Sequence, residues 1–273
     1  MMLSFYSESF MLSIKSVLAF LLAVASGLSV ASPVYITAND GADLYTVDTS
    51  NGASTLVGAF GASAPSVYAL SFSSAGVLYG ISAGSGWTNG QLEIINAKTG
   101  VATAVGSGTG IGNLMSMAFA PDGTLYAASW ATNDLYTINT TTGAATVVGA
   151  LGFGGVMDID FDNSGNMYAL SSSLYKVNTS TGAGTLATTL SDTCLMGMAI
   201  GAGNTFYATD YCVANTPLYK LNPVTGALTS VGDTGLGATM GGAFAPATVP
   251  EPGTLMLVGI GLCAAVALRR KRA

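Results

Sequence analysis

Three segments of this 273-residue chain combine aromatic rings with amides and carboxylates, a combination that suits the recognition of sugars. The residues concerned are Trp87 and Asn89; Trp130, Asn133 and Asp134; and Asp210 and Tyr211. An aromatic plane can pack against the C–H groups of a sugar ring, while the polar groups bond its hydroxyls. We take these residues as the candidate ligand-binding set. The alternative is that the tryptophans only pack between neighbouring structural units.

The sequence gives less support to catalysis, metal binding or nucleic-acid binding. The chain has no histidine, so it lacks the commonest general base and zinc ligand. Residues 32–250 hold twelve acidic residues against three lysines, which disfavours contact with phosphate backbones. We therefore expect no catalytic residue, no cofactor, no metal site and no nucleic-acid partner. The open alternatives are a carbohydrate- or lactone-active hydrolase using loop carboxylates, and a scaffold for protein partners.

One acidic segment, residues 158–165, resembles part of a calcium-binding loop. Asn163 stands where such a loop needs glycine, and Ala169 stands where it needs glutamate. In a strand, Asp158 and Asp160 would point to the same side. We therefore expect a structural role for these carboxylates, or a weak cation site of another kind, rather than a calcium site of this type.

The elements that must position these residues are short strands joined by a recurring turn. The turn starts with Asp or Asn and ends with glycine four residues later, at residues 48–52, 96–100, 139–143, 178–182 and 222–226. The Asx side chain can bond the turn backbone, and glycine supplies the positive φ that closes a hairpin. The closing glycines recur at a mean spacing of about 43.5 residues, which is typical of propeller blades.

The two ends of the repeat predict how the array closes. Residues 34–37 match the second strand of a unit, and residues 240–246 match the first strand. Pairing of these strands in one sheet would close a ring and remove exposed sheet edges. The prediction is an all-β fold, a five-bladed β-propeller over residues 32–248. An open β-solenoid of the same period is the alternative.

The hairpins also resemble those of known β-propellers. The Asp-Gly-x-Leu-Tyr segment at residues 122–126 and the x-Thr-Gly turns are similar to those of propellers of the YncE or NHL-like kind. The resemblance implies a fold and says little about activity.

Two cysteines flank one of the predicted hairpins. Cys194 and Cys212 lie on either side of a turn at residues 201–204, so the hairpin register can place them nearly opposite each other. Export from the cytoplasm would permit oxidation. We predict a disulfide between them; the alternative is a pair of free buried thiols.

The N-terminus has the pattern of an export signal. Lys15 precedes an apolar stretch at residues 17–24, and Ser29 and Ala31 fit a cleavage site. We predict a Sec signal peptide over residues 1–31. The alternatives left open are an uncleaved anchor and a translation start at Met11.

The C-terminus carries a second targeting pattern. Pro250, Glu251 and Pro252 precede an apolar run at residues 254–268, and Arg269 and Arg270 begin a basic tail. Proline holds the backbone extended, and clustered cations stay on the cytoplasmic side of a membrane. The layout resembles the PEP-CTERM sorting signal of Gram-negative bacteria. The alternative is an ordinary membrane anchor.

That resemblance implies a route and a partner. An exosortase-type protease of the inner membrane would cut near Pro-Glu-Pro, so residues 249–273 would form a removable sorting signal with a transmembrane helix. We expect Sec export, an inner-membrane intermediate, and delivery to the cell surface or extracellular matrix. The expected function is that of a non-enzymatic structural or binding protein, with exopolysaccharide as its candidate ligand.

Overall fold

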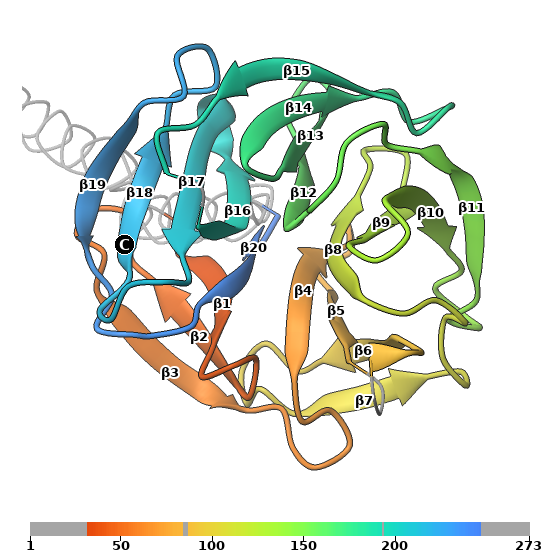
Figure 1. The fold of residues 1–273 in the computed structure, drawn as a ribbon. Helices are drawn as coiled ribbons and strands as arrows, with labels where there is room; N and C mark the ends of the chain where they lie inside the picture. Colours follow the sequence, from red (N-terminus) through yellow and green to blue (C-terminus); the bar gives the residue numbers. More distant parts are fainter. Residues whose placement is uncertain (1–31, 84–86, 193, 247–273) are drawn as a thin grey trace, which may run out of the picture. The chain divides into compact units, whose positions relative to one another are not determined.

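The computed structural model describes residues 32–83, 87–192 and 194–246, which form a five-bladed β-propeller (Figure 1). Each blade is a four-stranded antiparallel sheet, so the predicted fold is confirmed. The expected signal peptide and sorting tail lie outside the described residues. In the part of the chain that is described, no helix is long and apolar enough to cross a membrane.

The strands of each blade are named A to D from the axis outwards. Blade 1 contains β20 (Met240–Phe244), β1 (Val34–Ala38), β2 (Asp43–Val47) and β3 (Ser54–Ala59). Blade 2 contains β4 (Val67–Phe72), β5 (Leu78–Ser82), β6 (Gln91–Ile95) and β7 (Ala102–Val105). Blade 3 contains β8 (Leu114–Phe119), β9 (Leu125–Ser129), β10 (Asp134–Ile138) and β11 (Ala145–Ala150). Blade 4 contains β12 (Asp158–Phe161), β13 (Met167–Leu170), β14 (Ser173–Val177) and β15 (Gly184–Thr189). Blade 5 contains β16 (Leu195–Gly201), β17 (Thr205–Asp210), β18 (Pro217–Leu221) and β19 (Leu228–Asp233).

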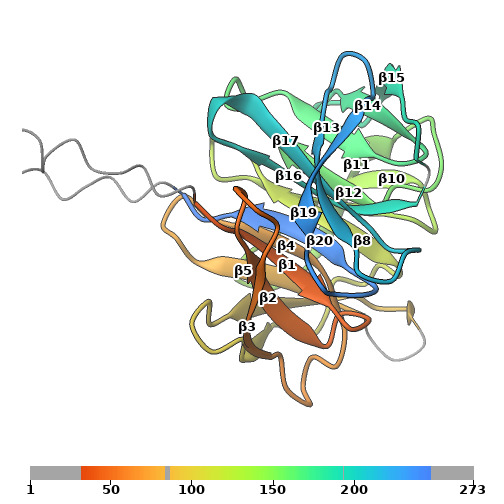
Figure 2. The same cartoon turned by 90° about the vertical axis from the view of Figure 1, so that its left-hand side faces the viewer.

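The ring is closed by the last strand of the described chain. The five A strands contact one another in turn around the axis (Figure 1). β20 pairs antiparallel with β1, with Val34 opposite Phe244, and the two strands lie side by side in Figure 2. Blade 1 is therefore completed by both ends of the repeat, as predicted, and the solenoid alternative is excluded.

The hydrophobic core is divided among the blade interfaces. Five clusters of buried apolar side chains occur in the described residues, one between each pair of neighbouring blades. Leu135 of blade 3 and Ile159 of blade 4, for example, belong to one cluster and are almost fully buried. Each sheet thus packs both faces against its neighbours, and burial of apolar area holds the ring together.

The recurring turns do more than close their hairpins. Asn139 Oδ1 accepts the N–H of Thr141 at 2.9 Å, and Gly143 has a φ of 75°, as the turn motif predicts. In addition, Gly182 of blade 4 lies against Gly149 in the D strand of blade 3, so close that a Cβ would overlap its backbone. The turn glycines of all five blades contact the D strand of the preceding blade in this way, and so tie neighbouring blades together.

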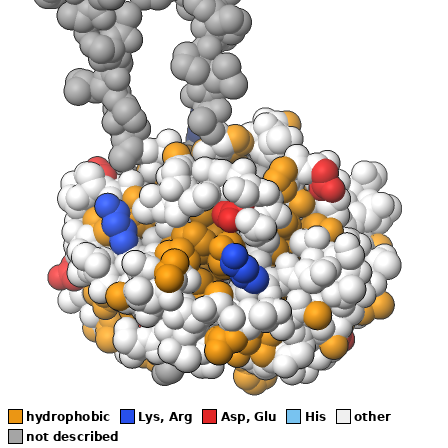
Figure 3. All heavy atoms as spheres, turned by 90° about the horizontal axis from the view of Figure 1, so that it is seen from above, with side chains coloured by type: hydrophobic (Ala, Val, Ile, Leu, Met, Phe, Trp, Pro, Cys, Tyr) orange, Lys and Arg blue, Asp and Glu red, His pale blue; other side chains and the backbone are white. Residues whose placement is uncertain are grey.

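The loops lie on two opposite faces of the propeller. The D–A and B–C loops form one face, here called the B–C face, and the A–B and C–D turns form the other, the C–D face. β20 ends and β1 begins on the C–D face. Figure 3 shows a side of the surface on which charged side chains are few and well separated, in keeping with a chain that is only 8% charged.

Candidate functional site

Trp87 and Trp130 lie in equivalent loops of adjacent blades on the B–C face. Their side chains are 41% and 50% exposed. Asn113 connects the two loops: its N–H donates to the carbonyl of Trp87 at 3.0 Å, and its carbonyl accepts the N–H of Trp130 at 2.9 Å. The backbones of the two tryptophans are therefore linked through one residue, Asn113.

Further aromatic residues extend this pair around the ring. Tyr68 packs against Trp87 with ring centroids 4.6 Å apart. Tyr211 donates its hydroxyl hydrogen bond to Asp40 at 2.9 Å, and that bond, with burial, raises the pKa of Tyr211. Tyr68 lies near enough to contribute to the same rise in pKa. Sequence reasoning missed Tyr68 because this residue belongs to strand β4 and not to a loop.

The polar residues of the candidate set mostly brace the loops. Asn89 accepts the N–H of Gly110 at 2.7 Å and donates to the carbonyl of Ser107 at 3.4 Å. Asn133 accepts the N–H of Gly155 at 3.3 Å, and Asp134 accepts the hydroxyl of Tyr136 at 3.4 Å. Asn89 and Asn133 thus hold neighbouring loops in place and Asp134 bonds within its own strand, so the indole faces are the main surface left for a ligand.

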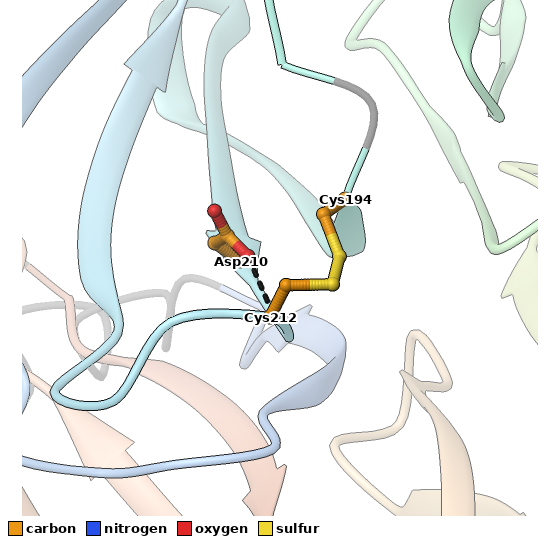
Figure 4. Close-up of side chains that lie close together, drawn as sticks. All are labelled: Cys194, Asp210 and Cys212. Atoms are coloured by element: carbon orange, nitrogen blue, oxygen red, sulfur yellow. Dashed lines mark hydrogen bonds between the residues drawn. A yellow bond between two sulfur atoms is a disulfide. The ribbon is translucent and has the colours of Figure 1, made fainter.

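Asp210 lies apart from the tryptophans, beside the cysteine pair of blade 5. Cys194 and Cys212 form a disulfide with Cα atoms 5.9 Å apart, and Asp210 accepts the N–H of Cys212 at 2.7 Å (Figure 4). Asp210 is buried, and burial raises its pKa, with a smaller contribution from the neighbouring carboxyl of Asp192. The sulfur and carboxylate atoms lie within 4.8 Å of one another, but the disulfide occupies both sulfurs.

The calcium-like segment runs along the innermost strand of blade 4. Asp158 accepts the N–H of Met198 at 2.8 Å, and Asp160 accepts the N–H of Ile200 at 2.6 Å. Both donors belong to β16, the inner strand of the next blade. At the position of Asp160 the other inner strands carry small residues: Ser71, Ala118, Ala199 and Ala243. The two carboxylates thus cap backbone N–H groups that would otherwise lack partners on an inner sheet edge.

Burial of these carboxylates makes the stability depend on pH. Burial raises the pKa of Asp160 to about 7 and that of Asp158 well above its usual range, against the opposing effect of the backbone hydrogen bonds. The folded state then binds protons more tightly than the unfolded state between about pH 4 and 7, so stability falls as pH rises through this window. We expect the free energy of unfolding to be about 2–3 kcal/mol higher at pH 5.5 than at pH 8.

Urea denaturation of the exported protein at the two pH values measures this difference. The matched variant is Asp160→Asn, which cannot titrate and should therefore reduce the pH dependence. Equal pH dependence in the wild type and this variant would show that Asp160 titrates at its ordinary pKa.

The fold and the C-terminal motif define a class, an exported β-propeller with a sorting signal. The PEP-CTERM protein-sorting motif matches residues 248–272, so this is a protein exported and sorted to the cell surface. The chain belongs to the family described as a repeat of unknown function (DUF6923), whose model matches residues 35–215.

Solved structures similar to this chain share its fold. A chain of the nidogen/laminin complex is 11% identical with a TM-score of 0.54, over 79% of this chain and 98% of that one. Another similar structure comes from a study of the de novo evolutionary emergence of a symmetrical protein. It is 18% identical with a TM-score of 0.52, and the match covers 77% of this chain and 98% of that one. The comparison with curated proteins gave no match. At these identities the likeness concerns the fold alone.

Proposed function

We propose that this protein is a non-enzymatic component of the cell envelope or extracellular matrix that binds exopolysaccharide through its B–C face. The observation that carries the proposal is the pair of exposed indoles, Trp87 and Trp130, held in adjacent blades by Asn113. Rigid aromatic planes beside polar groups suit the alternating C–H and hydroxyl surfaces of sugars.

The topology supports binding on this face in a sorted protein. The last described strand, β20, ends on the C–D face, so the sorting signal joins the propeller on the side opposite the tryptophans. A polymer bound at the indoles would therefore not meet the attachment point. An exosortase-type protease is the partner expected at that point, because the motif at residues 248–272 is the one such proteases recognise.

Three carboxylates on the B–C face have structural partners, which favours binding over hydrolysis. Asp192 accepts the N–H of Cys194, Asp210 accepts that of Cys212, and Asp40 accepts the hydroxyl of Tyr211. Each of these carboxylates has a structural partner, and the chain has no histidine to assist it. Turnover of a polysaccharide or lactone that is abolished by Asp210→Asn would favour the hydrolase alternative instead.

Substitution of the tryptophans tests the proposal. We expect Trp130→Ala or Trp87→Ala to weaken binding of the exported protein to its host's exopolysaccharide at least about tenfold, because each removes a stacking plane. The control is Val224→Ala, which truncates an 80% exposed side chain on the C–D face and should leave binding unchanged. Equal affinity of the wild type and both tryptophan variants, measured by calorimetry, would refute the proposed site.

A further inference from the structure

Blade 2 departs from the repeat at one position of its C strand. The other four blades carry tyrosine there: Tyr45, Tyr136, Tyr175 and Tyr219. In blade 4 this tyrosine packs beneath the preceding D–A loop, since the ring of Tyr175 stacks on Phe153 at 3.8 Å. Blade 2 has Glu93 instead, a side chain with no ring to fill the equivalent space.

An open hollow of about 740 Å³ lies next to this position. Its lining comes from the D–A loop that enters blade 2, from the B–C loop with Trp87, and from Ser82, Gln91 and Ala104 of the sheet. Ser82 pairs with Gln91, and Ala104 pairs with Glu93, so all four side chains share one face of the sheet. Ser82, Gln91 and Ala104 are here called the floor of the hollow, and Glu93 lies beside them on the same face of the sheet.

The floor offers hydrogen-bond acceptors and no free donors. Ser82 donates its hydroxyl hydrogen to Glu93 Oε1 at 2.8 Å, which leaves its lone pairs for the hollow. Gln91 uses Nε2 to donate to the carbonyls of Leu92 at 2.9 Å and Val105 at 2.8 Å, which leaves its Oε1. Both remaining groups are oxygens, so a ligand group on this floor must be a donor.

The surroundings favour a donor that is positively charged. Glu93 is fully buried, and its Oε2 has no hydrogen-bond partner among the described residues. A buried carboxyl oxygen without a partner is costly, and a nearby cation would offset that cost. Among the described residues that line the hollow there is no lysine or arginine. Trp87 and Tyr68 form its wall, and aromatic faces attract cations.

We propose that this hollow is a subsite for a sugar that carries a primary ammonium group. The ammonium would donate to Ser82 Oγ and Gln91 Oε1 beside the Glu93 carboxylate, while the sugar ring packs against Trp87. This inference rests on the proposed function and specifies its ligand as a partly deacetylated amino-sugar polymer.

Matched oligosaccharides test the proposal on the exported protein. The probes are a glucosamine oligomer and the N-acetylglucosamine oligomer of equal length, which differ in the charge and acetylation of the amine. We expect the wild type to bind the free amine at least about tenfold more tightly by calorimetry, and Glu93→Gln to abolish this preference. Asp122→Asn removes one negative charge from an exposed turn on the C–D face and should keep the preference.

The possible results separate this inference from the proposed function. Ser82→Ala gives an independent check should Glu93→Gln fail to fold, because it removes one of the two acceptors on the floor and should also lower the preference. Equal binding of both oligomers, lost in Trp130→Ala, would overturn the amino-sugar subsite and retain the sugar-binding face. If neither oligomer and no host polysaccharide bound, both the amino-sugar subsite and the sugar-binding function would be overturned. Equally tight binding of a lysine-rich peptide would overturn the subsite in favour of a protein partner.

Discussion

Replacing Gly182 with alanine will lower the free energy of unfolding of the exported protein by about 3 kcal/mol. Two costs combine at this position. Gly182 has a φ of 79°, where a side chain strains the backbone by about 1 kcal/mol. Its Cβ would also overlap the carbonyl oxygen of Gly149 in the neighbouring blade, and a backbone atom cannot move aside as a side chain can.

The same change at Gly123 separates these two costs. Gly123 has a φ of 89°, and nothing lies within 4 Å of the position its Cβ would take. Gly123→Ala should therefore cost only the strain of about 1 kcal/mol. Urea denaturation of the wild type and the two variants gives the comparison. If Gly182→Ala were no worse than Gly123→Ala, the contact between neighbouring blades would contribute nothing to stability.

Removing the carboxylate of Asp158 is the second change for which we expect a large effect. Asp158 is fully buried and accepts the N–H groups of Ile159 at 2.9 Å and Met198 at 2.8 Å. The backbone of Gly242 in β20 also opposes the rise in the pKa of Asp158. One side chain thus joins the inner strands of blades 4 and 5 and lies near the strand that closes the ring.

Asp158→Ala should cost roughly 3–5 kcal/mol, because it leaves the buried N–H groups of Ile159 and Met198 without an acceptor. Asp158→Asn retains the shape and one acceptor oxygen, so at pH 5.5 it should cost about 1 kcal/mol. Asp122→Ala is the control: its carboxylate accepts the N–H of Thr124 in an exposed turn, where water can replace it. Urea denaturation at pH 5.5 compares the three. A loss below about 1 kcal/mol for Asp158→Ala would mean that this residue does not stabilise the junction of blades 4 and 5.

Most of the architecture could be predicted from local patterns in the sequence. Turn chemistry located five hairpins, of which the one closed by Gly182 is typical, and strand alternation located the sheets around them. The unmatched strands at residues 34–37 and 240–246 predicted the closure of blade 1. These predictions succeed because hairpin turns and the two-residue period of strands depend on neighbours along the chain.

The candidate site was less accessible to the same reasoning. Trp87 and Trp130 could be placed on one face, because equivalent loops of a propeller lie on the same side. The partners of Asn89 and Asn133 could not be predicted, since their amides bond loops that follow later in the chain. Glu93 was visible as a break in a Leu-Tyr pattern, but its burial and unpaired oxygen depend on the surrounding fold.

The number of blades, the turn type, the closing strand and the sorting signal could all be predicted from the amino-acid sequence, because each depends on a local motif or on the order of motifs. The contacts that the same residues make between blades depend on the folded ring. The glycine that closes a hairpin also contacts the sheet of the preceding blade, and the acidic segment that resembled a calcium loop caps the inner strand of the following blade. Such contacts join residues about 30 to 40 positions apart or more, and their geometry follows from the way a closed ring packs sheet against sheet.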